Sequence, residues 1–443
     1  MKTQIASFDY VLVGGGLQSG LIALALRHQR PSARVAIIEQ SSRLAGNHTW
    51  SFHSTDIPDG ARPWIQPLSQ YQWPSYQVLV GGRKRNVSIG YHSVSSEYFA
   101  NVLENAASGS SDRLNLMLNS PVVSMSPDAV VLQNGQAIQA KVVIDNRGPS
   151  ESVRDSMMQG SFPGGFQKFW GFELALPSDW PIEHPVIMDD RVDQADGFRF
   201  VYTLPFESRR VLVEDTRFSN SSDLDRGDCF LQVDQYLRKV SQGKLGLENC
   251  EIVREESGVL PMPYRGSYPG VQSSTQPNGL VLSGGYRGGW FHAATGYSFP
   301  TAIAFANWVA NTPMEDLRTK IEREARRERY RAIFARFLNR LLFELVKPKT
   351  RYQIFRRFYS VLSEDRIARF YGHRFTSSDA ARIVIGIPPR GLRPIRFVKS
   401  FFNSVCRPPR SSQQGETRPD STRISSERDS TSNVCNSKAK VLT

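Results

Sequence analysis

The stretch DYVLVGGGLQSGLIALALRHQ, residues 9–29, constrains the fold of this chain more than any other part of it. It reads as a buried strand, a glycine turn and an apolar helix, and ARVAIIEQ, residues 33–40, follows as a second buried strand. This order predicts the βαβ unit that binds dinucleotides. Gly14 permits the tight turn, Gly16 lets the backbone approach a pyrophosphate, and Glu39 can accept hydrogen bonds from a ribose.

One position departs from the usual G-x-G-x-x-G pattern. Ser19 stands where the third glycine is expected, and Gly20 follows it. Serine is small enough for the helix to pack closely on the strands, so the departure is compatible with dinucleotide binding. An ordinary tight turn between a strand and a helix, with no ligand, remains the alternative.

Further strands and a mostly β region are predicted downstream of this unit. Strand patterns recur over 76–91 and 114–145, and the second ends in KVVIDNRG, whose Asp145 could return to the dinucleotide beside the first strand. Residues 166–260 predict a mostly β domain.

A second glycine-rich loop is predicted within residues 279–310. The pattern there is a strand, a loop that carries glycines and aromatic residues, and a helix that starts near Thr295 and Gly296. A helix N-terminus aimed at a cofactor ring can stabilise negative charge on it. The candidate cofactor-binding residues are Gly14, Gly15, Gly16, Leu17, Glu39, Asp145, Gly148, Gly284, Gly285, Thr295 and Gly296.

The positive charge of the chain is concentrated in one C-terminal segment. The net charge is +13, and residues 315–410 alone contribute +15, from 24 Lys and Arg against 9 Asp and Glu. Apolar residues recur there at helical spacing, so the segment predicts basic amphipathic helices. We favour an anionic membrane surface as their partner. A packed helical domain with a basic surface is the alternative, and we expect no nucleic-acid partner, because no recognisable nucleic-acid module accompanies the charge.

Other features argue against several classes of protein. The four cysteines are scattered, without a CxxC pair or a nearby His cluster, so we expect no disulfide framework and no metal site, and a reducing compartment fits. Glycines interrupt the uncharged run Tyr10–Leu26, which argues against a membrane-spanning helix or a cleavable signal peptide. Residues 407–443 are rich in Ser and Thr and poor in apolar residues, and we expect them to be disordered.

The stretch RVLVEDTRF, residues 210–218, predicts a strand that delivers two adjacent acids to one place. Successive side chains of a strand point to opposite faces, so only one of Glu214 and Asp215 can enter a given cavity. A strand that ends at a solvated edge, with both acids in water, is the simpler alternative.

Eight stretches that occur in order resemble one family. They are VGGGLQSGLIAL, GNHTWSFH, VIDNRG, GFQKFWGFEL, FRFVYTLPF, VLVEDTRFS, GVLPM and GYRGGWFHAATGYSFP. They resemble the bacterial lycopene β-cyclases, flavoproteins of carotenoid biosynthesis, and the C-terminal stretch 357–389 resembles the corresponding part of that family. The similarity covers roughly residues 8–400.

The resemblance implies an α/β fold, with a Rossmann-like FAD-binding domain, an inserted mostly β substrate domain and a C-terminal helical region. The expected boundaries are 1–165 for the first part of the FAD-binding domain, with an inserted strand segment near 76–92; 166–275 for the mostly β substrate domain; 276–310 for the last strand and helix of the FAD-binding domain; 311–406 for the basic helical region; and 407–443 for the tail.

The implied activity is lycopene β-cyclisation, in which the linear ψ-ends of lycopene become β-ionone rings, through γ-carotene to β-carotene, with no net redox change. The implied cofactors are reduced FAD and NAD(P)H as its reductant. The implied partners are lycopene, related carotenoids with ψ-ends and a membrane surface, and contact with other carotenoid enzymes stays open. The implied location is the cytoplasm, at the inner face of the membrane.

The resemblance also assigns residues. Glu214 suits the proton donor, since desolvation on an apolar strand raises the pKa of a carboxyl, whereas Asp215 is structural or modulates Glu214. The sequence leaves open whether Glu214 or the flavin donates the proton. The candidate substrate-binding residues are Trp50, Phe52, Trp290, Phe291 and His292. Aromatic rings can stabilise cations, and ordinary core packing is the alternative for them.

Two departures and two rival functions accompany this interpretation. Asn146 stands where a small residue is common. Ser283-Gly284-Gly285 stands where related flavin oxidoreductases often place an Asp for the ribityl chain. The cyclases likewise lack a firm acid at that position. The rival enzyme is a flavin monooxygenase or another carotenoid oxidoreductase, which would change the mass of its substrate. A non-catalytic flavin-binding or membrane-docking protein is the other rival.

Overall fold

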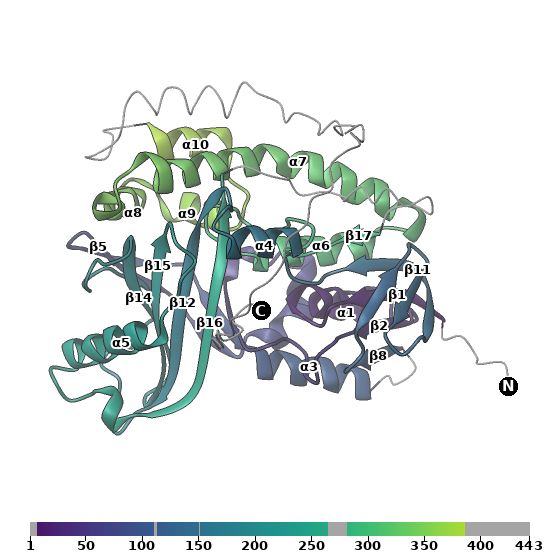
Figure 1. Cartoon of the computed structure of the whole chain (residues 1–443), viewed down its shortest axis with the longest axis horizontal. Coiled ribbons are helices and arrows are strands. Elements are labelled where there is room, and N and C mark those ends of the chain that lie inside the picture. Colours follow the sequence, from purple (N-terminus) through teal and green to yellow (C-terminus); the bar gives the residue numbers. More distant parts are fainter. Residues whose placement is uncertain (1–6, 110–112, 150, 265–280, 386–443) are drawn as a thin grey trace, which may run out of the picture.

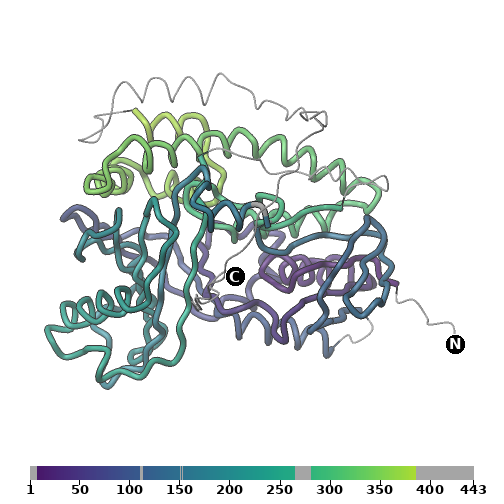
Figure 2. Tube along the Cα trace, viewed as in Figure 1, coloured from purple at the N-terminus to yellow at the C-terminus, as the bar shows by residue number. Residues whose placement is uncertain are grey.

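The computed structural model describes residues 7–109, 113–149, 151–264 and 281–385. Two large sheets lie side by side, and the C-terminal helices form a layer over both of them (Figure 1). The chain crosses from the first sheet to the second and back twice, once for residues 76–87 and once for residues 164–263, before it enters this helical layer (Figure 2). The cavity described below lies where the three parts meet.

The first sheet is the predicted dinucleotide-binding unit. Its parallel strands are β1 (Ser7–Val13), β2 (Val35–Ile38), β8 (Leu114–Met117), β11 (Ala137–Asp145) and β17 (Leu282–Ser283), in the order β8-β2-β1-β11-β17, and β9 (Val122–Met125) and β10 (Ala129–Leu132) add an antiparallel edge. Helices α1 (Leu17–Gln29) and α6 (Phe299–Asn311) pack against each other, and α3 (Ser96–Ser108) contacts α1 and β8. Because Val13 is in register with Ile38 and Asp145, and Asp145 with Ser283, the loops that follow these strands meet at one edge of the sheet.

The helix predicted to start near Thr295 and Gly296 begins four residues later, at Phe299. Gly296 has φ of 67° and its N–H donates to the carbonyl of His292 at 2.9 Å, so the chain turns back before the helix can form. Pro300 then occupies the first turn of α6. Backbone N–H groups in a first turn have no carbonyl partner within the helix, so a proline there costs no hydrogen bond. Thr295 and Gly296 therefore belong to the loop that precedes α6.

The second sheet has the order β16-β12-β15-β14-β13-β5-β6. Its strands are β16 (Glu251–Pro263), β12 (Gly164–Ala175), β15 (Arg210–Ser219), β14 (Phe198–Glu207), β13 (Val186–Asp189), β5 (Tyr76–Val80) and β6 (Arg83–Val87). The segment predicted as an insertion near 76–92 thus extends this sheet through β5 and β6. A small third sheet joins β3 (Thr49–His53), β4 (Tyr71–Trp73) and β7 (Tyr91–Ser95).

Helix α5 (Arg226–Val240), which the sequence analysis did not predict, covers one face of the second sheet. Apolar side chains of α5 such as Val233 and Leu237 are fully buried against Val211 and Val213 of β15. The opposite face of β15 borders the cavity, so nearly the whole strand is buried although it carries charged residues. This double burial explains why β15 lacks the polar alternation of a solvated strand.

The basic C-terminal segment is helical as predicted. Its helices are α7 (Met314–Arg340), followed by a π-helical turn over 341–345, then α8 (Tyr352–Val361), α9 (Glu364–Tyr371) and α10 (Ser377–Val384). The buried guanidinium of Arg351 donates to the carbonyls of Leu342 at 2.8 Å and Phe218 at 2.9 Å, which fixes this layer to the end of β15. Among the described helices, none is both long enough and apolar enough to span a bilayer. The tail predicted to be disordered, 407–443, lies outside the described residues.

Candidate active site

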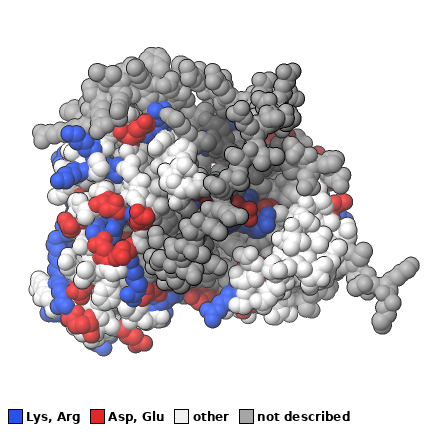
Figure 3. All heavy atoms as spheres, viewed as in Figure 1, with Lys and Arg blue, Asp and Glu red and all other residues white. Residues whose placement is uncertain are grey.

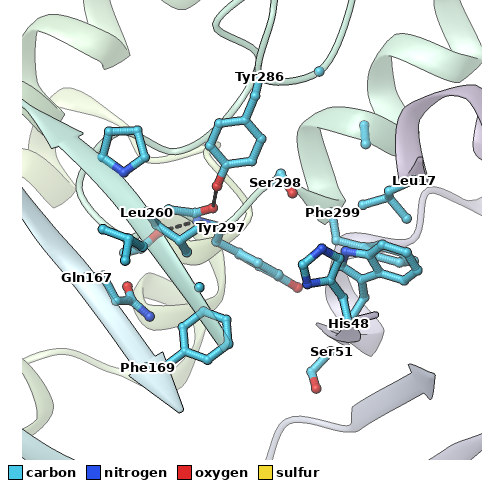
Figure 4. Close-up of a pocket in the computed structure, with 18 of the residues that line it drawn as sticks. Leu17, His48, Ser51, Gln167, Phe169, Leu260, Tyr286, Tyr297, Ser298 and Phe299 are labelled. Atoms are coloured by element: carbon cyan, nitrogen blue, oxygen red, sulfur yellow. Dashed lines mark hydrogen bonds between the residues drawn. The ribbon is translucent and has the colours of Figure 1, made fainter. Parts of the chain in front are cut away.

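A single large cavity of about 1470 Å³ connects the glycine loop of the first sheet with the second sheet and with helix α8. Its floor is one face of β16, β12, β15 and β14, and its opposite wall comes from β3 and from the loop before α6. Figure 4 shows part of it, with Gln167 and Phe169 of the second sheet on one side and Leu17, His48 and Phe299 on the other.

The glycine loop is shaped for a phosphate group. Gly14 has φ of 96°, which favours glycine, and a Cβ placed on Gly16 would meet no atom within 4 Å, so this backbone faces open space. Gly16 caps α1 without a side-chain hydrogen bond, and the first turn of α1 holds no acid. The free N–H groups at this helix end attract an anion, as a dinucleotide pyrophosphate requires.

The rest of this end of the cavity also suits a dinucleotide. Glu39 stands at the end of β2, where its carboxylate accepts from the N–H of Gly15 at 2.6 Å and of Ser41 at 2.8 Å. Basic side chains line the same end and can balance phosphate charge; they are Arg43, Arg147, Arg154 and Arg287. The residues present therefore fit a bound dinucleotide.

Nine of the eleven candidate cofactor-binding residues line the cavity: Gly14, Gly15, Gly16, Leu17, Glu39, Gly148, Gly285, Thr295 and Gly296. Asp145 and Gly284 do not. The Asp145 carboxylate pairs with Arg147 at 2.9 Å and with Arg287 at 3.4 Å, so it orients two basic side chains. A Cβ on Gly284 would lie 2.1 Å from Oδ1 of Asn146, so this glycine provides space for Asn146.

Glu214 lies on the cavity floor in the second sheet. It faces Tyr202 on β14 and Gly171 on β12, and the next row along the sheet holds Phe200, Thr216 and Phe169. The surroundings of its carboxyl are mostly apolar and aromatic. Such a place disfavours a charged carboxylate unless a cation accompanies it.

The carboxyl of Glu214 has no such cation among the described residues. Its side chain accepts one hydrogen bond, from the Thr216 hydroxyl at 2.5 Å, and only 9% of the residue is exposed. Burial, and then the charge of Glu256, raise the pKa of Glu214 to about 8, although the Thr216 hydroxyl opposes the rise. Glu214 therefore carries a proton at neutral pH and can donate it.

Asp215 points to the opposite face of β15, where α5 packs. Its carboxylate accepts from Arg199 at 2.8 and 2.7 Å and from Arg217 at 2.8 Å, and Asp228 of α5 pairs with both guanidinium groups. This buried cluster ties α5 to the sheet. The alternation of the strand thus separates the two acids, as the sequence predicts.

The aromatic candidates divide into two groups. Trp50 and Trp290 line the cavity; Trp50 also packs edge-on against Phe99, and the indole N–H of Trp290 donates to the carbonyl of Ser283 at 2.9 Å. The other three candidates lie behind the cavity wall.

Phe52, Phe291 and His292, which the sequence predicts to bind the substrate, are not among the residues that line the cavity. The Phe52 side chain is fully buried, and its ring stacks on Phe299 at 4.2 Å inside the core. The Phe291 ring stacks on Tyr286 at 4.4 Å. His292 is fully buried, 4.7 Å from the ring of Phe370, because the chain turns back at this point.

The sequence analysis missed several residues of the cavity. Glu256 of β16 lies near Glu214, and Tyr202 and Phe169 come from strands that the sequence predicts without their register. Only the pairing of the strands brings these side chains together. The signal available in the sequence was the alternation within each strand, which gives the face but not the neighbours.

A family model and relatives that match most of the chain place it in one family. The pattern of the family described as lycopene cyclase protein matches residues 9–396. A lycopene beta-cyclase from Pseudescherichia vulneris is 37% identical over 86% of this chain and 94% of its own length. A lycopene beta-cyclase from Pantoea ananas is 36% identical over 86% of this chain and 95% of its own length.

Solved structures share the fold at low sequence identity. A geranylgeranyl bacteriochlorophyll reductase-like protein from Thermoplasma acidophilum has a TM-score of 0.54 and 12% identity, over 90% of this chain and 100% of that one. A probable FAD-dependent monooxygenase from Pseudomonas aeruginosa has a TM-score of 0.52 and 15% identity, over 78% of this chain and 98% of that one. The predicted fold class, an α/β flavoprotein architecture with a C-terminal helical region, is confirmed.

The buried carboxyl of Glu214 should make the stability of the fold depend on pH. The folded-state pKa of about 8 exceeds the ordinary value of 4.5, so the contribution of Glu214 to stability is fully present below pH 4.5 and is lost as pH rises to 8. Glu214→Gln removes this loss. The free energy of unfolding of the variant, relative to that of the wild type, should therefore rise by on the order of a few kcal/mol from pH 5 to pH 8.5.

Urea unfolding at both pH values measures this difference. Glu104→Gln, at an exposed position of α3, is the control and should keep the pH dependence of the wild type. A Glu214→Gln variant whose stability follows the wild type at both pH values would contradict a protonated Glu214.

Proposed function

This chain belongs to the lycopene cyclase protein family, and we propose that it is a lycopene β-cyclase that closes the linear ψ-ends of lycopene into β-ionone rings. The observation that carries the proposal is Glu214, a buried carboxyl without a cationic partner that shares one cavity with a dinucleotide-binding loop.

The reaction moves protons and leaves the oxidation state of the substrate unchanged. Glu214 gives its proton to C2 of the terminal double bond, which leaves a cation at C1. The electrons of the C5=C6 bond form the new bond between C6 and C1, which leaves a cation at C5. A proton then leaves C6 for a base, a role that the carboxylate left on Glu214 can take, and the C5=C6 double bond forms again. The product has the mass of the substrate, and Glu214 must regain its proton before the next turnover.

The walls of the cavity suit a cationic intermediate. Phe169, Phe200 and Tyr202 surround the carboxyl, and their ring faces can stabilise positive charge as they do for ammonium groups. The same rings exclude water, which would otherwise add to the cation and give an alcohol. The remaining length of the cavity, toward α8, can hold the unreacted polyene.

FAD is the cofactor that we propose for the dinucleotide end. Gly14, Gly16 and the first turn of α1 would hold its pyrophosphate, and Glu39 would accept hydrogen bonds from its ribose. Reduced flavin, when bound, supplies negative charge that stabilises a nearby cation. NAD(P)H is the proposed reductant.

We propose that the protein lies on the cytoplasmic side of a membrane, where its hydrocarbon substrate resides. Exposed basic side chains surround the end of the cavity at α8: Arg83, Lys84, Lys347, Lys349, Arg356 and Arg382. Figure 3 shows basic groups along the edge where α8 and β5 lie in Figure 1, whereas acidic and basic groups mix over α5. Such an edge complements the anionic headgroups of the inner leaflet.

Glu214→Gln should abolish most cyclisation while the fold stays intact, since the amide keeps the shape and loses the proton. Positioned proton transfer contributes about 10²–10⁴-fold, so a loss of that size is expected. The assay is the conversion of lycopene to γ- and β-carotene with FAD and NAD(P)H, and the product mass is checked against the substrate. Near-normal β-carotene from this variant would remove Glu214 as the donor, and products that gain oxygen would indicate a monooxygenase.

Asp215→Asn provides the contrast for Glu214. Because Arg199 and Arg217 lose a charged partner, we expect a lower unfolding temperature. The protein that remains folded should still cyclise lycopene. A well-folded but inactive Asp215→Asn variant would reverse the assignment of the two acids.

Gly16→Val should abolish flavin binding, because its side chain would occupy the open space where the pyrophosphate is expected. The measurement is the flavin absorbance of the purified protein. Gly60→Val is a matched control, since a Cβ there also meets no atom within 4 Å but lies outside the cavity. Full flavin content in Gly16→Val would place the cofactor elsewhere.

Reversing two charges near α8 should weaken binding to anionic vesicles. Each basic residue near such a surface contributes about 1 kcal/mol, so the double variant Lys347→Glu/Lys349→Glu should lose about tenfold or more. The double variant Lys239→Glu/Lys244→Glu, beside α5, carries the same charge change and should bind like the wild type. Sedimentation with vesicles of rising anionic lipid content measures the effect, and equal binding by both variants would contradict the proposed edge.

A further inference from the structure

A second carboxyl, Glu256, faces the same cavity as Glu214. Gly171 of β12 is paired with Glu214 of β15 on one side and with Glu256 of β16 on the other, so the three residues form a row across the sheet. A Cβ placed on Gly171 would lie 3.2 Å from Cδ1 of Leu212, 3.3 Å from Cγ of Glu256 and 3.5 Å from Cβ of Glu214. The glycine therefore lets the side chains of Glu214 and Glu256 approach each other across β12, beside the methyl group of Leu212.

The carboxyl groups of Glu214 and Glu256 differ in their hydrogen-bond and ion-pair partners. Oε2 of Glu256 accepts from the Arg254 guanidinium at 2.6 Å and from the Thr49 hydroxyl at 2.7 Å. Glu214 has only the Thr216 hydroxyl. Glu256 is 4% exposed, and its Oε1 accepts no hydrogen bond from any residue within the described ranges. Glu256 is thus an anchored carboxylate, whereas Glu214 is a carboxyl without a cation.

The segment Asn47-His48-Thr49-Trp50 supplies part of this anchor. Arg254 donates to Oδ1 of Asn47 at 3.1 Å and to the Thr49 hydroxyl at 2.6 Å, in addition to its bonds to Glu256 and to Glu173. The Asn47 amide donates in turn to the backbone carbonyl of Glu255 at 2.7 Å. This segment therefore fastens the wall of the cavity to β16 at the position of Glu256.

We propose that Glu256 is a positioning residue whose carboxylate, held ionised by Arg254 and Thr49, keeps the proton on Glu214 between turnovers. The inference rests on the proposed function of Glu214 as the proton donor. The charge on Glu256 acts across β12 at Gly171, in an apolar place beside Leu212, and disfavours a second negative charge at Glu214. Glu256 itself does not exchange a proton with the substrate in this scheme.

The other groups around Glu214 leave Glu256 as the main source of this effect. Asp215 lies on the far face of β15, where Arg199 and Arg217 balance its charge. Tyr202 of β14 and Tyr91 of β7 are neutral, because burial raises the pKa of both hydroxyls. Thr216 favours the ionised form of Glu214 and so acts in the opposite direction.

Arg254 explains how Glu256 can stay charged in a buried place. Burial raises the pKa of the Glu256 carboxyl above its ordinary value, and the charge of Arg254 and the Thr49 hydrogen bond limit that rise and favour the ionised form. The Arg254 guanidinium is shared with Glu173, at 3.0 Å, so it remains paired when Glu256 is changed. A substitution at Glu256 therefore does not leave Arg254 without a partner.

The experiment is an infrared titration of the protonated carboxyl of Glu214, identified by its absence in Glu214→Gln. In Glu256→Gln we expect the titration of Glu214, and the alkaline loss of cyclisation, to move to lower pH by about one unit. Glu256→Asp keeps the charge and should restore most of the wild-type profile. Glu255→Gln, on the other face of β16 and paired with Arg226, is the control and should leave the titration unchanged.

Two outcomes would overturn the inference. One is a Glu256→Gln variant in which the Glu214 titration does not move. The other is a folded variant that is inactive at every pH with a normal Glu214 titration, which would make Glu256 a base toward the substrate. Failure of the wild type to cyclise lycopene would instead reject the proposed function, and the infrared titration remains informative in that case.

Discussion

The alternation of side chains along β15 is the constraint on which the rest of the site depends. Glu214 and Asp215 are adjacent in the chain, yet the pleat sends one to the cavity and the other to the face covered by α5. Two guanidinium groups neutralise Asp215, whereas Glu214 receives a single hydroxyl. In a medium of low dielectric this difference decides the protonation of each acid, so one strand carries both a structural anion and a neutral acid.

The cavity exists because three separate parts of the chain meet at it. The carboxyl edge of the first sheet supplies the glycine loop, the second sheet supplies the acid and the aromatic floor, and α8 closes the far end. Proteins of the same fold include a probable FAD-dependent monooxygenase, so the architecture alone does not select the chemistry. In the proposed function, the groups that line the cavity select it, and here they include a protonated carboxyl and aromatic rings suited to a proton-initiated reaction.

Local sequence predicted what local physics determines. The βαβ unit, the strand at 210–218 and the basic helices follow from hydrophobic periodicity and glycine placement, and the separation of Glu214 from Asp215 follows from the period of a strand. Features that depend on strand register or on loop paths could not be read in this way. Phe52 was assigned to the cavity, but its ring is covered by Phe299 in the core, and Glu256, distant in sequence, reaches Glu214 only through β12.

Two sequence departures that looked independent belong to one contact. Ser19 replaces the third glycine of the dinucleotide pattern, and Asn146 stands where a small residue is usual; the Asn146 amide donates to the Ser19 hydroxyl at 2.9 Å. Gly284 makes room for the Asn146 side chain, since a Cβ there would overlap it. The hydrogen bond joins α1 to the end of β11 beside the glycine loop. Ser19 and Asn146 each depart from the usual residue at their position in a dinucleotide-binding unit. Together they form a buried hydrogen bond that holds the loop in place of close packing at a third glycine.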